Sequence, residues 1–299
     1  TADSIKIANE GSKSLFYTDL TRQQEKQHKT QLKEDKNNVL YPKEEDDGIF
    51  SPACPTSINS RFVTMCLGPA GCGKSYYINK LVLDYHNTYP NSLIFYISAC
   101  DLELDPSYDS SRKYIDQIDV FQLNSAIDFK SMKDIQNSLF IYDDCDSGFS
   151  TDIGHRLIFP EMTDEEYEEL PLKNKKQITK EIKDKTEIVD IYVKQSLLSM
   201  IKNGRKMGIS ILYVSHKPFD GIMQTSMCSE CTSVVLFPAS TNRDLLKKYI
   251  YQKLSLSKAQ ANYIMSMKRW YKYDFLEIFY RVSKPFIVTD DMIEHIPEF

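Results

Sequence analysis

The sequence predicts an α/β fold in which helices cover both faces of a doubly wound, mainly parallel sheet. Two observations favour this fold. Short, nearly continuous apolar segments of strand length recur along the chain, and stretches with helical spacing separate most of them. A strand that is buried on both faces has such a continuous apolar run, whereas a half-exposed strand alternates. With 299 residues, 41% of them hydrophobic, the chain is long and apolar enough to bury this core.

Each element follows from its own pattern. The predicted strands are the apolar runs 62–67, 92–98, 120–123, 138–143, 209–214 and 233–237. After the first of them we expect a helix, because apolar side chains have helical spacing at Ile78, Leu81, Val82 and Tyr85. The C-terminal segment 241–299 predicts two amphipathic helices and then a strand over 275–282, with a helical core of Leu245, Leu246, Tyr249 and Ile250.

Two regions depart from this alternation. Residues 1–59 are polar and charge-mixed, so we expect an N-terminal extension or arm, either an assembly tail or a loosely packed surface segment. A helix over 23–38 would have almost no core face. Residues 60–299 form the main domain, whose highly charged stretch 161–187 is expected to be an insertion or lid, with a helix resuming at Ile188.

Composition limits the classes of protein that fit. The net charge of −5 argues against a surface coated in positive potential but permits a local basic channel. No run approaches the ~18 apolar residues of a membrane span, and no apolar N-terminal segment suggests secretion, so we expect no membrane partner. The 7 cysteines are scattered and odd in number, which favours free thiols. The C-x-x-C pair of Cys228 and Cys231 lacks the second pair of a structural zinc site.

A glycine-rich loop follows the first predicted strand. Residues 68–75 read G-P-A-G-C-G-K-S, which matches G-x-x-x-x-G-K-[ST], a loop whose backbone N–H groups surround a phosphate. In such a loop the lysine, here Lys74, contacts the β- and γ-phosphates, and the hydroxyl of Ser75 ligates Mg²⁺. We therefore expect ATP and Mg²⁺ as ligands, rather than a glycine-rich structural turn. The predicted nucleotide contacts are Gly68, Pro69, Ala70, Gly71, Cys72, Gly73, Lys74, Ser75 and Tyr76.

Two carboxylates end the strand predicted over 138–143. Four apolar residues precede Asp143 and Asp144, which is typical of the second acidic element of nucleotide hydrolases. Asp143 is predicted to hold Mg²⁺, and Asp144 to act as the general base that polarises the attacking water. Without the glycine-rich loop, an acidic turn at a strand end would be the simpler interpretation.

A third element narrows the class. Residues 204–218 read G-R-K-M-G-I-S-I-L-Y-V-S-H-K-P, which runs from a helix end through a glycine turn into a strand with polar residues at its end. With the loop and the paired acids in this order, the chain resembles the FtsK/HerA superfamily of P-loop ATPases, which implies a RecA/FtsK-like P-loop NTPase fold. Within it, the chain is similar to the genome-packaging ATPases of double-jelly-roll DNA viruses, such as poxviruses, other large nucleocytoplasmic DNA viruses and virophages. The likeness covers residues 61–240.

This resemblance implies roles for two further residues. Arg205 matches the arginine that enters a neighbouring subunit's site and stabilises charge on the transferring phosphoryl group, a role for which Lys206 and Arg156 compete. The alternative for Arg205 is an exposed base at a helix C-terminus. His216 stands where the superfamily usually has a glutamine sensor, and Ser215 is the nearest alternative. The implied catalytic set is Lys74, Asp144, Arg205 and His216.

The resemblance also implies what the protein does. It would be a Mg²⁺-dependent ATPase that drives viral double-stranded DNA into a preformed capsid, as a homo-pentameric or homo-hexameric ring in contact with capsid vertex proteins. It would work in the host cytoplasm at viral assembly sites, with association with the virion as an alternative. Two other functions fit the same motifs. One is another DNA pump or helicase of this type, such as a conjugation coupling protein, and the other is an ATP-gated capsid-vertex assembly module with little turnover.

The C-terminal segment interleaves basic and aromatic residues between Arg243 and Arg281. Basic side chains neutralise phosphates, and aromatic rings stack on exposed bases. We expect most of these aromatic residues to be core, and the pairs Lys247–Lys248 and Lys268–Arg269 to be the better candidates for contact with DNA.

Overall fold

The computed structural model describes residues 4–10, 13–18, 54–55, 61–98, 102–120, 123, 125–128, 135–145, 163–216, 227–282, 285–290 and 293–298. Near the N-terminus, three strands form a small antiparallel sheet in the order β2-β1-β3. They are β1 (Ser4–Glu10), β2 (Lys13–Thr18) and β3 (Cys54–Pro55). The helix considered over 23–38 lies outside the described residues, and the boundary of the N-terminal extension stays a prediction.

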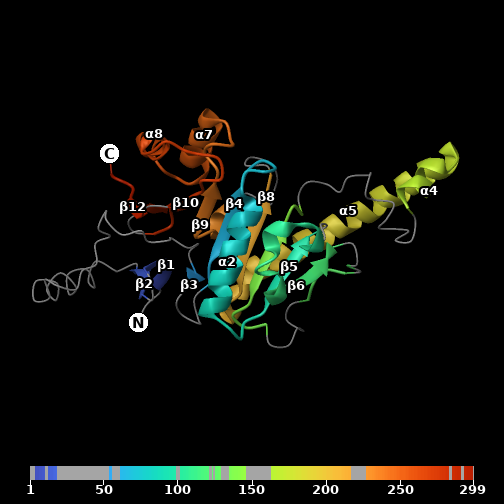
Figure 1. Ribbon diagram of the computed structural model, residues 1–299, viewed down its shortest axis with the longest axis horizontal. Helices are drawn as coiled ribbons and strands as arrows, with labels where there is room; N and C mark the ends of the chain where they lie inside the picture. The colour runs from blue at the N-terminus through green and yellow to red at the C-terminus, as the bar shows by residue number, and fades with distance from the viewer. Residues whose placement is uncertain are drawn as a thin grey trace, which may run out of the picture.

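A nine-stranded sheet forms the centre of the molecule (Figure 1), and its strand order is β12-β11-β10-β9-β4-β8-β7-β5-β6. The strands that run parallel to one another are β4 (Val63–Leu67), β5 (Ile94–Ser98), β6 (Asp116–Asp119), β7 (Leu139–Asp143), β8 (Ser210–Ser215) and β9 (Ser233–Leu236). The antiparallel extension beside β9 comprises β10 (Leu276–Phe279), β11 (Phe286–Val288) and β12 (Ile293–His295). The predicted α/β fold with a mainly parallel sheet is confirmed.

One predicted strand is wrong. The apolar run 120–123 predicts a strand, but the strand in this region is β6, which ends at Asp119. Val120 is fully buried directly after it, and residues 121 and 122 lie outside the described part of the chain. β6 is the edge strand of the sheet beside β5, and three of its four residues are polar, with Ile118 packed partly against the core. A continuous apolar run is expected only where both faces of a strand are covered, and the side chains of β6 are exposed or half-buried.

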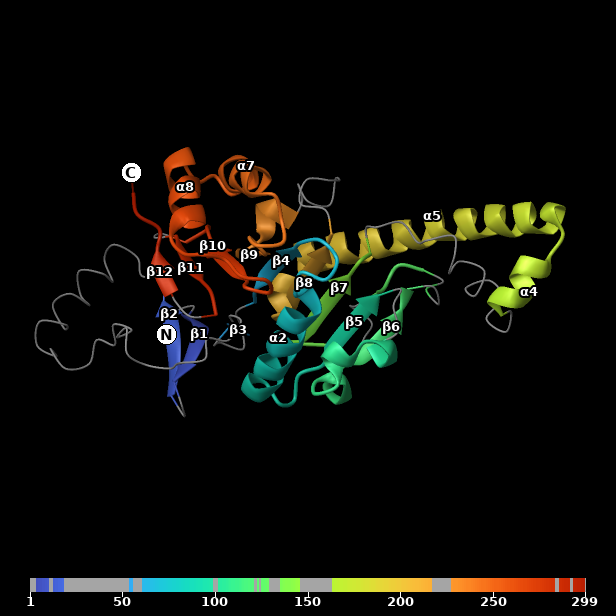
Figure 2. The same ribbon diagram turned by 45° about the horizontal axis from the view of Figure 1, so that its top comes forward.

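Helices cover both faces of the sheet, as Figures 1 and 2 show. On one face, α2 (Lys74–Thr88) packs Tyr77, Ile78 and Leu81 into a core cluster with side chains of β4, β7 and β8. On the other face, α5 (Leu172–Asn203), α7 (Arg243–Lys253) and α8 (Lys258–Ser266) belong to a second cluster. Successive residues of one strand join opposite clusters, so β4 is buried on both faces, as its apolar run predicts.

The helix expected to resume at Ile188 begins earlier, within the charged stretch 161–187, whereas the insertion or lid itself stays a prediction. After the short helix α4 (Asp164–Glu169), α5 runs without a break from Leu172 through Ile188 to Asn203 (Figure 2). Lysine and glutamate are good helix formers, so a charged sequence continues a helix without difficulty. Ile178 and Ile182 are buried one turn apart within this stretch, whereas Ile188 is exposed. The sparse apolar stripe therefore begins well before the predicted restart.

The C-terminal segment has the predicted pair of helices and then a strand. Leu246, Tyr249 and Ile250 of α7 are buried, but Leu245 is exposed, so that part of the predicted core is wrong. Of the aromatic residues expected to be core, Tyr249 is buried and Trp270 packs partly against the core, whereas Tyr271 and Tyr273 are exposed. Among the helices that the structure describes, none combines the length and the apolar character that a membrane crossing requires.

Candidate nucleotide-binding site

The glycine-rich loop connects β4 to α2, and two of its glycines are required by geometry. Gly73 is the residue before α2 and has a φ of 118°, in the left-handed region that disfavours residues with a side chain. A Cβ atom on Gly68 would lie 2.6 Å from Cys72 Sγ and 2.8 Å from Phe237 Cδ2. Cys72 itself is buried beneath the loop. The loop therefore packs on the core at one end and turns sharply into the helix at the other.

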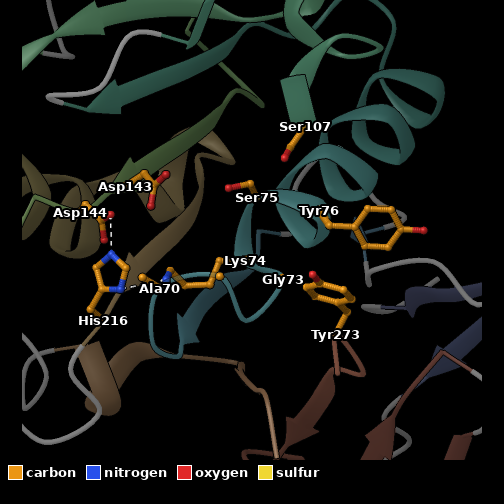
Figure 3. A pocket seen from close by; sticks show the side chains of 11 residues that line it. Ala70, Gly73, Lys74, Ser75, Tyr76, Ser107, Asp143, Asp144, His216 and Tyr273 are labelled. Carbon is orange, nitrogen blue, oxygen red and sulfur yellow. Dashed lines mark hydrogen bonds and ion pairs between the residues drawn. The ribbon is translucent and has the colours of Figure 1, made fainter. Parts of the chain in front are cut away.

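The loop borders a cavity of about 760 Å³, at the carboxyl ends of β4, β7 and β8 (Figure 3). Its lining residues are Ala70, Gly71, Gly73, Lys74, Ser75, Tyr76, Ser107, Asp143, Asp144, His216 and Tyr273. The structure thus brings together most of the residues predicted for the nucleotide, the metal and catalysis. Gly68, Pro69 and Cys72 do not line this cavity, although Gly68 and Pro69 border a smaller adjoining one with His216.

The ammonium group of Lys74 is fully engaged by the protein. Its Nζ atom lies 3.0 Å from Gly68 O, 3.1 Å from Pro69 O and 3.0 Å from Nδ1 of His216. An ammonium group donates three hydrogen bonds, and these three contacts use all of them. A phosphate oxygen that binds Lys74 must therefore replace one of these acceptors.

His216 links this lysine to the acidic pair. Because Lys74 only donates, Nδ1 of His216 is an acceptor, and the proton of the neutral ring lies on Nε2. Nε2 is 2.6 Å from Oδ2 of Asp144, to which it donates (Figure 3). One imidazole therefore connects the lysine of the phosphate loop to the predicted general base. Ser215, the alternative sensor, is fully buried and does not line the cavity.

The acidic pair has two carboxylate oxygens that no hydrogen bond satisfies. Oδ2 of Asp143 accepts a 2.5 Å hydrogen bond from the hydroxyl of Tyr96, and Oδ2 of Asp144 accepts from His216. The Oδ1 atom of each residue is buried without a hydrogen-bond partner. Burial, together with the neighbouring charge of Asp144, raises the pKa of Asp143 to about 6.

The unpartnered Oδ1 atom of Asp143 fits a divalent cation. An uncompensated carboxylate in a buried position is costly, and a bound cation would remove that cost. Carboxylate and hydroxyl oxygens are the ligands that Mg²⁺ takes beside nucleotide phosphates, and Ser75 lines the same cavity as both carboxylates. The donor set of Ser75 and Asp143 is therefore suited to Mg²⁺, which is the metal that the sequence predicts.

Sequence reasoning missed two buried tyrosines next to Asp143, which are Tyr96 and Tyr108. Tyr96 is in β5, Tyr108 ends the 3-10 helix η2 (Pro106–Tyr108), and their rings meet edge to face at 5.5 Å. Burial and the charge of Asp143 raise the pKa of both hydroxyl groups well above the ordinary value, so both stay protonated. The available signal was a tyrosine inside the apolar run 92–98, since a buried hydroxyl requires a polar partner.

Arg205 is not part of this cavity. It is exposed in the 3-10 helix η5 (Gly204–Met207), just before β8, whereas His216 directly follows the other end of β8. A six-residue strand spans roughly 20 Å. Arg205 therefore lies at the N-terminal end of β8, whereas the cavity of the same chain lies at the C-terminal end of this strand. Of the two competing residues, Arg156 lies outside the described part of the chain, and Lys206 is exposed beside Arg205 in η5.

The remaining sequence candidates lie elsewhere. Lys268 pairs with Asp274 at 3.3 Å, and the guanidinium of Arg269 lies over the ring of Tyr271, whereas Lys248 is exposed on α7. Cys231 is fully buried, and Cys228 Sγ is 3.9 Å from the hydroxyl of Tyr249. Within the part of the chain that the structure describes, no group of three His, Cys, Asp or Glu side chains could hold a metal ion.

Several solved structures are similar to this chain. The DNA-packaging ATPase B204 from Sulfolobus Turreted Icosahedral Virus has 13% identity and a TM-score of 0.45, over 81% of this chain and 99% of that one. B204 from Sulfolobus turreted icosahedral virus 2, in complex with ATP-gammaS, has 12% identity and a TM-score of 0.42, over 79% and 97%. The conjugation coupling protein TcpA with ATPgS has 12% identity and a TM-score of 0.44, over 81% of this chain and 62% of that one.

At this level of identity and TM-score, the function of a similar structure cannot be assigned to this chain. Any function must be inferred from the residues of the site. No protein-family model and no curated protein sequence matches the chain.

Proposed function

We propose that this protein is an ATPase whose turnover moves double-stranded DNA. One observation carries the proposal. Lys74 of the glycine-rich loop, the paired Asp143 and Asp144, and His216 line a single cavity that has the volume of a nucleotide site. Phosphoryl transfer to water needs a cation at the phosphates, a metal-binding carboxylate and a group that positions the water. The residues that line the cavity include a candidate for each of these three groups.

Each side chain then has a distinct role. Lys74 exchanges a protein acceptor for the β- and γ-phosphates and neutralises their charge. Asp144 uses its buried, unpartnered Oδ1 to accept the proton of the attacking water, while its Oδ2 stays bonded to His216. His216 fixes the orientation of that carboxylate and, through Nδ1, responds to the position of Lys74. Through His216, the binding of a phosphate at Lys74 would affect the position of Asp144, the general base.

Ser75 and Asp143 would hold Mg²⁺, which supplies positive charge against the phosphates when bound. The chain's own contribution is to present Asp143 in one orientation. Tyr96 holds Oδ2 of Asp143, so Oδ1 is the oxygen that remains for a cation.

The proposal includes a ring of identical subunits. Arg205 is exposed and lies at the edge of the sheet away from its own cavity, so it could act on phosphate only in a neighbouring subunit. An arginine supplied in this way is worth about 10³–10⁵ in rate in other nucleotide hydrolases. A homo-pentamer or homo-hexamer would place each Arg205 at the next subunit's site.

The finer part of the proposal concerns the DNA and its destination. The order of the glycine-rich loop, the paired acids and the strand that ends at His216 resembles the packaging ATPases of DNA viruses. We infer that the substrate is a viral genome, that capsid vertex proteins are partners, and that the work takes place at assembly sites in the host cytoplasm.

Steady-state ATP hydrolysis by the full chain, with and without duplex DNA, tests this function. A motor should accelerate several-fold on duplex, and an Asp144→Asn chain prepared in the same way controls for contaminating activity. Hydrolysis that ignores duplex would indicate a gated assembly module instead, and absence of hydrolysis would contradict the ATPase. Electron microscopy with a non-hydrolysable ATP analogue and duplex should show closed rings around DNA, and monomers alone would contradict the ring.

A further inference from the structure

The end of the cavity away from the acidic pair is aromatic. Tyr76, in the first turn of α2, and Tyr273, in the turn before β10, both line it beside Gly73. Their side chains lie on one side of Lys74, while Asp143, Asp144 and His216 lie on the other (Figure 3). The cavity therefore has a polar end suited to phosphates and a second end of different chemistry.

Both tyrosine side chains are exposed. Tyr76 is 53% exposed and Tyr273 is 51% exposed. The ammonium of Lys80 lies 4.7 Å from the ring centre of Tyr76, and that of Lys272 lies 4.8 Å from the ring centre of Tyr273. A ring has two faces, and a lysine covers one of them. The other face of each ring can stack on a planar group.

The backbone of Tyr273 is strained. Its φ of 76° is in the left-handed region, which is rare and unfavourable for a bulky residue. The turn that enforces it is held by Asp274, which accepts from the backbone N–H of Tyr271 at 3.0 Å and pairs with Lys268 at 3.3 Å. The protein thus keeps an unfavourable backbone conformation at a residue that faces the cavity.

This turn lies directly against the glycine-rich loop. A Cβ atom placed on Gly73 would be 3.4 Å from both Cα and Cδ1 of Tyr273. The strand that follows the turn is bonded to α2, because the hydroxyl of Tyr77 donates to Oε2 of Glu277 at 3.0 Å and the rings of Tyr77 and Phe275 meet edge to face. Tyr273 is therefore held in a fixed position relative to Tyr76 and the loop.

We propose that Tyr76 and Tyr273 form the binding site for the base of the nucleotide whose phosphates contact Lys74. The inference rests on the proposed nucleotide site and names its second half. The base class is purine, because stacking on an aromatic ring grows with the area of the planar group and requires no hydrogen-bond pattern. The C-terminal segment, which sequence alone favours as core or as a DNA contact, thereby becomes part of the nucleotide site.

Binding measurements that separate the base from the phosphates test this inference. Calorimetric titrations with a non-hydrolysable ATP analogue and with inorganic tripolyphosphate should be compared for the parental chain, Tyr76→Ala, Tyr273→Asn and Tyr273→Phe. Asparagine accepts a left-handed backbone, so Tyr273→Asn removes the ring without adding strain. Tyr271→Ala is the matched control, since Tyr271 is 60% exposed in the same turn but does not line the cavity.

We expect Tyr76→Ala and Tyr273→Asn each to weaken binding of the ATP analogue by about 5- to 100-fold. Their affinity for tripolyphosphate should stay parental, and Tyr273→Phe and Tyr271→Ala should bind both ligands normally. A 2-aminopurine nucleotide should lose fluorescence on binding the parental chain and less on binding Tyr273→Asn. Parental affinity for the ATP analogue in both ring-deletion variants would overturn the inference and leave the phosphate site intact. A parental chain that binds neither ligand would overturn the proposed function itself.

Discussion

The Nζ atom of Lys74 lies 3.0 Å from Nδ1 of His216. Through the other nitrogen of the same ring, 2.6 Å from Oδ2 of Asp144, the phosphate-loop lysine is connected to the acidic end of the site. The ring must be neutral to accept from the lysine, and it competes with phosphate for the ammonium group. His216 thus restrains Lys74 before a phosphate arrives and orients Asp144 afterwards.

Replacing His216 with alanine should therefore affect turnover and binding in different ways. Turnover should fall by about 100-fold, because Asp144 loses the donor that fixes its carboxylate. Affinity for a non-hydrolysable ATP analogue should be no weaker than parental, since one competitor for Lys74 is removed. His216→Gln, which keeps one polar contact, should retain more activity than His216→Ala. Rapid kinetics and calorimetry on the three chains check this, and parental turnover in His216→Ala would contradict it.

The two adjacent acids should separate into two phenotypes. Asp144 has a φ of 52°, which asparagine also adopts, so Asp144→Asn preserves the backbone. It should bind the ATP analogue normally and hydrolyse ATP at least about 100-fold more slowly, because an amide does not accept the proton of water. Asp143→Asn should instead weaken the Mg²⁺-dependent part of nucleotide binding. Equal losses of binding and turnover in both variants would contradict this division.

Asp143 predicts a pH dependence of stability. Its pKa is raised from 3.8 to about 6 in the folded chain, by burial first and then by the charge of Asp144. Between about pH 4 and pH 6 the folded state holds more protons than the unfolded state, so the free energy of unfolding falls as pH rises. In EDTA, the Tm of the parental chain relative to Asp143→Asn should fall across this window, and Mg²⁺ should restore it above pH 6. A difference in Tm that does not change with pH would contradict the assignment.

Arg205 predicts complementation between subunits. Arg205→Ala should bind ATP with parental affinity and hydrolyse it poorly, and mixing with Lys74→Ala should restore activity. The Lys74→Ala subunit keeps its arginine and can complete the intact phosphate site of its neighbour. Lys206→Ala removes the adjacent exposed base that competes for this role and should stay active alone, whereas loss of its activity would assign the role to Lys206. No rescue in rings shown to be mixed would leave Arg205 a structural residue.

The parts of the fold that the sequence predicts are those with local patterns. The strands β4, β7, β8 and β9 are buried on both faces, so each has an apolar run. The edge strand β6 has no such run, so the sequence predicts this strand over 120–123 instead of over Asp116–Asp119. The length of α5 was missed because Ile178 and Ile182 are isolated among charged residues, although they continue its buried stripe.

The candidate site also contains residues that short motifs predict and residues that they do not. The loop, Asp143, Asp144 and His216 belong to short motifs at strand ends, and parallel strands bring their carboxyl ends to one edge of the sheet. Tyr96 and Tyr273 have no motif. Tyr96 reaches Asp143 across the pairing of β5 with β7, and Tyr273 reaches Gly73 because an antiparallel extension returns the chain to α2. Such contacts between distant segments depend on tertiary packing.

If the cavity beside Lys74 binds and hydrolyses ATP, both activities depend on this lysine. ATP binding and Mg²⁺-dependent hydrolysis should be measured for the parental chain and for Lys74→Ala, with Lys183→Ala, which removes an exposed lysine of α5, as the control for loss of a charge. Removal of the cation that the glycine-rich loop places at the phosphates should abolish both binding and hydrolysis, while Lys183→Ala keeps both and all three chains unfold at similar Tm. Parental hydrolysis by folded Lys74→Ala would contradict the account.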